Sequence, residues 1–137
     1  MEQICHTCFL DNTSHSCYII KHETDIDIEY VYTCPSEATK IDDTEGVVAH
    51  YDNILSSVKN KWIYVCDCEN FGLKHALAIN TAIGTIKLIN NKYSHNLIKI
   101  NIINSNSFIH ITLNVIWPFL NEELKNKLYI DDKPFMK

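Results

Sequence analysis

The pattern of apolar and polar positions predicts alternating helices and strands after residue 43. Residues 44–58 carry apolar side chains on one face of a 3.6-residue repeat, which predicts a helix with Asp43 or Thr44 as its N-cap. These apolar residues are Val47, Val48, Tyr51, Ile54, Leu55 and Val58. The next segment, 62–67, is a run of bulky, mostly apolar residues. Such a run is typical of a strand that is covered on both faces.

A second helix and a second strand follow segment 62–67. Residues 73–92 place apolar side chains on one side, so we expect one long helix, and the isoleucine-rich segment 97–104 favours a strand. Two strands joined in this way are expected to be parallel, with a right-handed crossover. Residues 107–120 predict a helix that is apolar nearly all round. Pro118 should bend or end this helix because proline removes a helix hydrogen bond.

Shorter elements are expected near the two ends of the chain. A helix restarts at Asn121, and residues 128–130 can form a final strand. Segments 17–20 and 27–33 contain many β-forming residues, and we expect them to join the same sheet. The sequence therefore predicts one α/β domain over residues 1–137, with a small, mixed, mainly parallel β-sheet flanked by helices.

Composition and charge exclude several classes of function. The net charge is -5 and all twelve basic residues are lysine, which argues against a nucleic-acid partner and against bidentate phosphate recognition. No apolar run approaches the roughly 18 residues that cross a bilayer. The start Met1-Glu2-Gln3 does not resemble a secretory signal. We therefore expect a cytoplasmic protein with reduced cysteines.

Four side chains near the N-terminus have the chemistry of zinc ligands: Cys5, Cys8, His15 and Cys17. Their spacing lacks the second separated pair of most structural zinc sites, since His15 and Cys17 are only two residues apart. We therefore expect no metal and no cofactor, with these four as the weak candidates and free thiols as the alternative.

The sequence gives weak support for catalysis. Asp67, Glu69, Asn104 and Ser105 follow two presumed parallel strands, at the sheet edge where α/β folds place ligands. We interpret Asp67 as a cap for the loop or helix that follows. The chain contains no glycine-rich phosphate loop and no nucleophile-elbow motif, so we expect no enzyme.

Residues 47–130 resemble the CRAL-TRIO lipid-binding domain family in the order and spacing of several motifs, whereas residues 1–43 match poorly. The matching features are a strand ending in Asp67, the nearby Gly72, a long helix ending in Tyr93, a strand leading into Asn104, then Phe108, the run Trp117-Pro118-Phe119-Leu120 and the run Lys127-Leu128-Tyr129-Ile130.

The resemblance implies a sheet that forms the floor of an apolar pocket, and non-enzymatic binding or transfer of a lipid or another hydrophobic ligand. The expected ligand-binding residues are Tyr64, Phe71, Ile79, Ile83, Ile86, Phe108, Val115, Ile116, Trp117 and Lys127. Lys127 matches a lysine that the family uses near an inositol phosphate. The stretch 93–96 lacks the proline, acid and base of phosphoinositide-binding members. We expect a reduced member of the family, without a counterpart of its C-terminal gate segment.

An apolar cleft without a gate would be unfavourable in water, at about 2.5 kcal/mol for each 100 Å² left exposed. Side chains could fill the cleft, the N-terminal segment could fold over it, or a partner or second copy could cover it. The alternative function is therefore a protein-protein interaction module or homodimer that uses an exposed apolar patch without lipid. Divergent members of the family act as modules of this kind, and we expect at most transient contact with a membrane.

Overall fold

A computed structural model describes residues 17–20, 27–38 and 41–135 of the chain. Its strands are β1 (Tyr18–Ile20), β2 (Ile28–Thr33), β3 (Lys61–Asp67), β4 (Leu97–Ile103), β5 (Leu128–Ile130) and β6 (Lys133–Pro134). Its helices are η1 (Pro35–Glu37), α2 (Thr44–Ser56), α3 (Leu73–Leu77), α4 (Ile79–Leu88), η2 (Ile89–Tyr93), α5 (Ser107–Ile116), η3 (Trp117–Phe119) and α6 (Glu122–Asn126).

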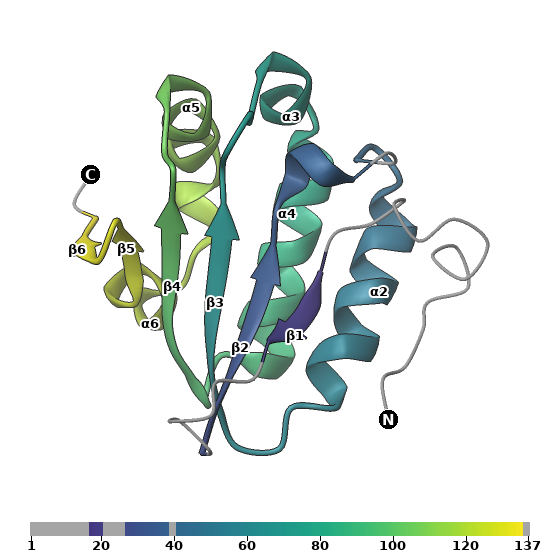
Figure 1. Cartoon of the computed structure of the whole chain (residues 1–137), viewed down its shortest axis with the longest axis vertical. Helices are drawn as coiled ribbons and strands as arrows, with labels where there is room; N and C mark the ends of the chain where they lie inside the picture. The colour runs from purple at the N-terminus through teal and green to yellow at the C-terminus, as the bar shows by residue number, and fades with distance from the viewer. Residues whose placement is uncertain (1–16, 21–26, 39–40, 136–137) are drawn as a thin grey trace.

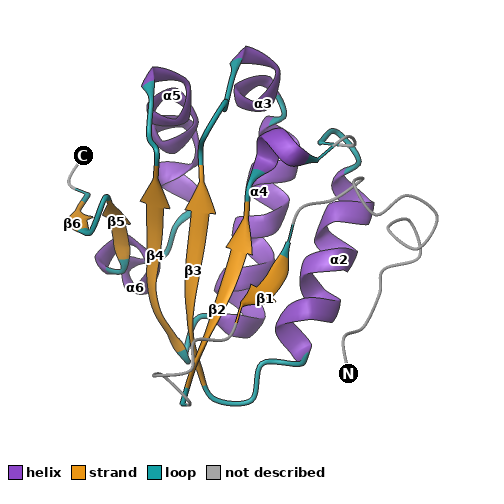
Figure 2. Ribbon diagram, in the orientation of Figure 1, coloured by secondary structure: helices purple, strands orange, loops and turns teal. Residues whose placement is uncertain are grey.

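The six described strands form one sheet in the order β1-β2-β3-β4-β5-β6 (Figures 1 and 2). Strands β2 to β5 run parallel, while β1 and β6 pair antiparallel at the two edges. This confirms the predicted α/β fold with a mixed, mainly parallel sheet, and it confirms that the predicted segments 17–20 and 27–33 supply strands to that sheet. The short strand β6 was not predicted, because two residues after a turn carry no periodic pattern.

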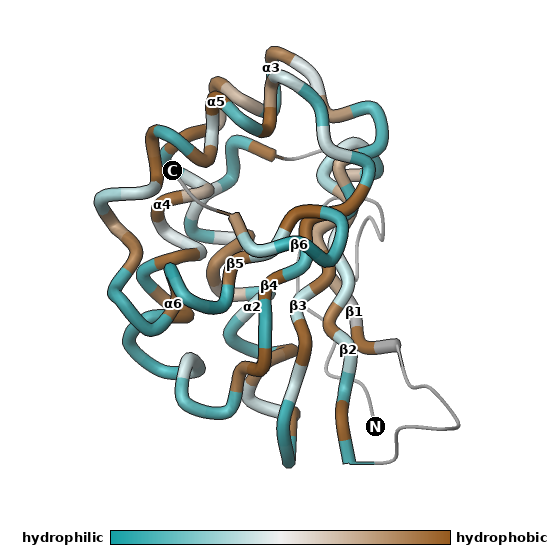
Figure 3. Tube along the Cα trace, turned by 90° about the vertical axis from the view of Figure 1, so that its left-hand side faces the viewer, coloured by the Kyte–Doolittle hydropathy of each residue, from teal (hydrophilic) through white to brown (hydrophobic). Residues whose placement is uncertain are grey.

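The described helices gather on one face of the sheet. Each parallel strand is followed by helical segments and then by the neighbouring strand, so the chain always advances in the same direction across the sheet. Right-handed crossovers that advance in one direction place their helices on the same side. Figure 3 shows this arrangement, with the helices lying to one side of the strands.

The helix-facing side of the sheet forms the floor of the interior. Side chains alternate between the two faces of a strand. Val31 of β2 pairs in register with Tyr64 of β3, and Tyr64 pairs with Ile100 of β4. These residues, with Cys66 and Ile102 two positions further along, belong to the apolar core or pack against it. The opposite face carries the residues between them.

The helix α2 begins and ends at polar contacts. Its predicted N-cap is confirmed, because the Asp43 side chain accepts a hydrogen bond from the Gly46 amide at 3.2 Å. Near its other end, Asp52 accepts hydrogen bonds from the Tyr93 hydroxyl and from Lys92 Nζ, the latter at 3.0 Å. The bond from Tyr93, followed by that from Lys92, lowers the pKa of Asp52. These contacts join α2 to the helical turn that follows α4.

The prediction of one continuous helix over residues 73–92 is wrong. The backbone leaves the helical region at Ala78 (φ -78°, ψ 51°), which separates α3 from α4, and the last turn is a π-helix. The segment α3 packs against α5, whereas α4 packs against both α2 and α5. The break therefore lets the two segments run in different directions (Figure 1). The apolar spacing continues through Ala78, so the pattern alone gave no sign of it.

The helix α5 is less enclosed than its apolar sequence suggests. It ends before the proline turn at Pro118, as predicted, and Asn121 then caps α6 by accepting a hydrogen bond from the Leu124 amide at 2.8 Å. Ile111 and Val115, however, are exposed on the side of α5 that faces away from the sheet. One face of this helix therefore lacks a partner among the described residues.

Candidate functional site

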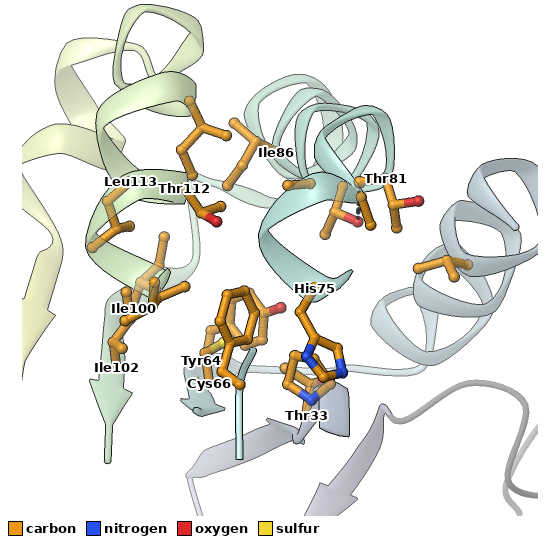
Figure 4. A pocket seen from close by; sticks show the side chains of 18 of the residues that line it. Thr33, Tyr64, Cys66, His75, Thr81, Ile86, Ile100, Ile102, Thr112 and Leu113 are labelled. Atoms are coloured by element: carbon orange, nitrogen blue, oxygen red, sulfur yellow. Dashed lines mark hydrogen bonds between the residues drawn. The ribbon is translucent and has the colours of Figure 1, made fainter. Parts of the chain in front are cut away.

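A cavity of about 170 Å³, partly open to solvent, lies between the sheet and the helices. Figure 4 shows side chains converging on it from the strands below and from α3, α4 and α5. The larger apolar lining residues are Ile41, Val47, Tyr51, Tyr64, Phe71, Ile86, Ile100, Ile102, Ile109, Leu113, Ile116, Leu120 and Leu128. Its wall is therefore mainly apolar.

Small side chains on α4 leave room for the cavity. Thr81, Ala82 and Thr85 line it from one side of α4, and Ala78 lines it from the N-cap position just before the helix, so the four residues follow a spacing of 0, 3, 4 and 7. Ile86 is the next lining residue on this helix. These four side chains are too short to fill the space between α4 and the sheet, so that space stays open.

Two buried tyrosines form part of the cavity wall. The hydroxyls of Tyr51 and Tyr64 lie 2.7 Å apart, and their rings meet edge to face with centroids 6.0 Å apart. Thr33 also hydrogen-bonds the Tyr51 hydroxyl. Burial raises the pKa of both tyrosines well above the ordinary value. Both side chains therefore stay neutral, and their hydroxyl groups hydrogen-bond to each other.

The threonine hydroxyls of the helical wall are bonded to backbone carbonyls. Thr85 Oγ1 donates to the Thr81 carbonyl at 3.0 Å, and Thr112 Oγ1 donates to the Phe108 carbonyl at 3.3 Å. Thr81 Oγ1 donates to the Ile41 carbonyl at 2.8 Å. Their hydroxyl hydrogens are thus already bonded within the protein, so these residues offer no spare hydrogen-bond donor to the cavity.

His75 differs from these polar neighbours. It lies in α3, lines the cavity and is only 7% exposed. Its Nδ1 accepts a hydrogen bond from the Gly72 amide at 2.8 Å, while its buried Nε2 has no hydrogen-bond partner. Burial, and then the nearby charge of Lys74, lower the pKa of His75 below its usual 6.5. The imidazole is therefore neutral at pH 7.

Cys66 brings a thiol to the cavity wall. Its Sγ lies 4.0 Å from Sγ of Cys68, and both are free thiols. The hydrogen bond with Cys68 and burial raise the pKa of Cys66 well above its ordinary value. Because the thiolate is the nucleophilic form, a protonated Cys66 is a poor nucleophile.

Asp67 is a structural acceptor at the end of β3. It accepts hydrogen bonds from the Tyr32 hydroxyl at 2.6 Å, from Asn104 Nδ2 at 2.9 Å and from the Glu69 amide at 3.0 Å. Burial opposes ionisation, but these three bonds outweigh it and lower the pKa of Asp67. The prediction that Asp67 caps the following loop is confirmed. Asn104 reaches it from a left-handed backbone conformation (φ 53°) that asparagine tolerates.

The structure brings four of the predicted ligand-binding residues together in the cavity wall: Tyr64, Phe71, Ile86 and Ile116. They come from β3, the loop after it, α4 and α5. Their contact with a ligand stays a prediction.

The other predicted ligand-binding residues lie outside the cavity lining. Those that pack partly buried against the core are Ile79, Ile83, Phe108 and Trp117. Val115 is 45% exposed. Lys127 Nζ donates to Glu123 Oε1 at 2.9 Å and to the Ser94 carbonyl at 2.8 Å, so its charge already has a partner. A ligand role for these six residues also stays a prediction.

Sequence reasoning missed the cavity residues that are small or polar. It selected large apolar positions on the helix after Gly72, whereas the cavity lies along the stripe from Ala78 to Thr85. The spacing of small residues at 0, 3, 4 and 7 was a signal that could have located it. His75 carried no such signal, because its role depends on the break in the helix.

Three of the four weak metal candidates, Cys5, Cys8 and His15, lie outside the described residues. Cys17 is buried beside β1, with its carbonyl 2.7 Å from His50 Nε2. Within residues 17–20, 27–38 and 41–135, no group of three or more histidine, cysteine or acidic side chains is placed to hold a metal. In the same ranges, no helix has the length and apolar character to cross a membrane.

Comparisons with known proteins agree with this architecture. The family model described as "CRAL/TRIO domain" matches residues 43–137. A crystal structure of Sfh5 shares the fold, with a TM-score of 0.66 and 14% sequence identity, and the match covers 95% of this chain and 52% of that chain. The present chain thus spans about half the length of this solved structure. No curated protein matches the present chain. Because the family model covers most of the sequence and the solved structure has the same fold, the chain belongs to the CRAL/TRIO domain family.

Proposed function

We propose that this protein binds a hydrophobic ligand, in particular a single acyl chain or a molecule of similar width, in the cavity between the sheet and α4. The observation that carries the proposal is a hollow, mainly apolar interior in a small domain. Protein interiors are normally packed to the density of organic crystals, so a mainly apolar space of this size between a sheet and its helices is unusual. Membership of the CRAL/TRIO family adds independent support.

The cavity volume indicates the size of the ligand. At about 170 Å³ it is close to the roughly 150 Å³ of an engineered apolar cavity that binds benzene, and it is smaller than the roughly 300–1,000 Å³ of pockets for drug-sized ligands. A ring or part of one hydrocarbon chain fits this space. A two-chain phospholipid would require the walls to move apart, so we favour a single-chain ligand.

The chemistry of the wall supports binding without catalysis. Tyr51 and Tyr64 are neutral and hydrogen-bonded to each other, and the Cys66 thiol is protonated. Asp67 follows Cys66 on β3, so its side chain points to the opposite face of the sheet. Nucleophilic catalysis needs a nucleophile within reach of a base. The described lining residues show no such pair. The free thiols Cys66 and Cys68 fit our proposal that the protein works in the cytoplasm.

Solvent extraction and mass spectrometry test the proposed function. We expect purified protein to release a single-chain lipid in stoichiometric amount, or to take one up from vesicles that contain a fluorescent fatty-acid methyl ester. The matched control is Ala82→Leu, which places three more carbon atoms in the cavity and should abolish both results. A wild-type protein that carries no lipid and takes none up would contradict the proposal.

A second candidate is the protein-protein interaction module or homodimer predicted from the sequence. The observation in its favour is a patch of exposed apolar side chains on α3 and α5, which lie side by side in Figures 1 and 3. Its main residues are Leu73, Leu77, Ile111 and Val115. Sedimentation should then show a concentration-dependent dimer that Leu77→Asp disrupts. A monomer at all concentrations would argue against the homodimer.

A further inference from the structure

Among the described polar groups that line the cavity, one buried atom stands apart. Nε2 of His75 has no hydrogen-bond partner. The tyrosine hydroxyls bond to each other, and the hydroxyls of Thr85 and Thr112 bond to backbone carbonyls. Buried polar groups in proteins are nearly always paired, so an unpaired one in a binding cavity indicates a partner that is not part of the chain.

The hydrogen bonds of His75 fix which of its nitrogens carries the proton. A backbone amide can only donate, so the Gly72 amide requires an unprotonated Nδ1 as its acceptor. A neutral imidazole with an unprotonated Nδ1 has its proton on Nε2. The unpaired atom is therefore a donor, and its natural partner is an oxygen with a lone pair.

The position of His75 is held from two sides. Nδ1 is bound at the start of α3, and the Phe71 ring packs against the imidazole with centroids 5.2 Å apart. Figure 4 shows His75 reaching from α3 toward Thr33, while Ile100 and Leu113 lie on the other side of the cavity. The cavity thus has one end with a donor and one end that is apolar.

We infer that His75 Nε2–H donates a hydrogen bond to an uncharged carbonyl oxygen of the ligand, as in a ketone, ester or amide with a hydrocarbon tail. The inference rests on the proposed function, because it names the class of ligand for the same cavity. A carboxylate is disfavoured, since the described lining residues include no lysine that could neutralise a buried charge. The hydrocarbon tail then points toward Ile100 and Leu113.

Two probes of equal chain length test this inference: n-decane and decan-2-one. Their dissociation constants are measured by NMR titration of the whole protein, and the ratio of the two constants is compared between variants. His75→Met should reduce the preference for decan-2-one about tenfold, which corresponds to about 1.4 kcal/mol. His75→Gln should keep most of it, because glutamine at this helix position can accept from the Gly72 amide and still donate. His95→Met changes an exposed histidine outside the cavity lining and should have no effect.

A second measurement on the wild-type protein does not depend on how the variants fold. Decan-2-one should shift the ¹⁵N and ¹H resonances of His75 Nε2–H, whereas n-decane should leave them nearly unchanged. Equal shifts with both probes, or the same ratio of constants in wild type and His75→Met, would overturn the role of His75 while the cavity still binds. Binding of neither probe would overturn the proposed function and this inference together.

Discussion

Filling the cavity should stabilise the protein, and the substitution Ala82→Leu tests this. Ala82 lies in the middle of the small-residue stripe on α4. Large-to-small substitutions indicate that an empty cavity costs about 24 cal/mol for each Å³. For a cavity of 170 Å³ this gives an upper bound of about 4 kcal/mol. There is therefore stability to be gained at this position.

The size of the gain follows from the atoms added. Leucine adds three carbon atoms, each worth about 0.8 kcal/mol when buried. Ordering the longer side chain costs about 0.5–1 kcal/mol. We expect the free energy of unfolding to rise by about 1.5 kcal/mol, measured by urea denaturation followed by circular dichroism. Ala49→Leu, at an exposed position of α2, is the control and should change it by less than about 0.5 kcal/mol.

The sign of the change in the free energy of unfolding distinguishes a hollow interior from a filled one. In a filled interior the additional carbons would clash and destabilise the protein by about 1–3 kcal/mol. A loss of stability of that size in Ala82→Leu, with an unchanged Ala49→Leu, would refute the claim that the space between α4 and the sheet is hollow.

Three further predictions concern the framework around the cavity. Asn106→Ala should lower the free energy of unfolding by about 1–2 kcal/mol, because Asn106 caps α5 and donates a hydrogen bond to the Phe71 carbonyl at 2.9 Å. Asn114→Ala, at an exposed position of the same helix, should change it little, and equal losses in the two variants would contradict the cap. Wild type should be more stable than Asp67→Asn above pH 4, and the difference should shrink as the pH falls further, because the depressed pKa of Asp67 favours the folded state only while the carboxylate is ionised. A difference in urea denaturation that does not depend on pH would refute this. Leu124→Ala should lower the free energy of unfolding by about 2–5 kcal/mol, because Leu124 is fully buried. Leu77→Ala, at a residue that is 70% exposed, should lower it by less than about 0.5 kcal/mol in the same assay, and similar losses in the two variants would argue against the described core.

Much of the fold could be predicted because it follows from local pattern. The apolar face of α2 and its cap at Asp43, and the strand–helix–strand order after Trp62, appear where periodicity and turn chemistry placed them. The break at Ala78 could not be predicted in this way. It separates α3 from α4 within an unbroken apolar repeat, and it depends on how the two segments pack against other helices.

The candidate site was predictable only in part, for a related reason. Large apolar residues such as Tyr64 and Ile86 were selected because they dominate a hydrophobic pattern, and they do line the cavity. A cavity, however, is also defined by side chains that are too short to fill it, such as Ala82. The donor on His75 is visible only once its other nitrogen is seen to be occupied by Gly72. Short side chains and single hydrogen bonds leave little trace in hydropathy.

The most direct test locates a bound ligand relative to particular methyl groups. With protein labelled at isoleucine and leucine methyls, decan-2-one should give intermolecular nuclear Overhauser effects to Ile86, Ile100 and Leu113 in the cavity wall. These effects should disappear in Ala82→Leu. Effects confined to Leu77 and Ile111 on the exposed patch, or no effects at all with the probe present at saturating concentration, would contradict an apolar ligand inside this domain.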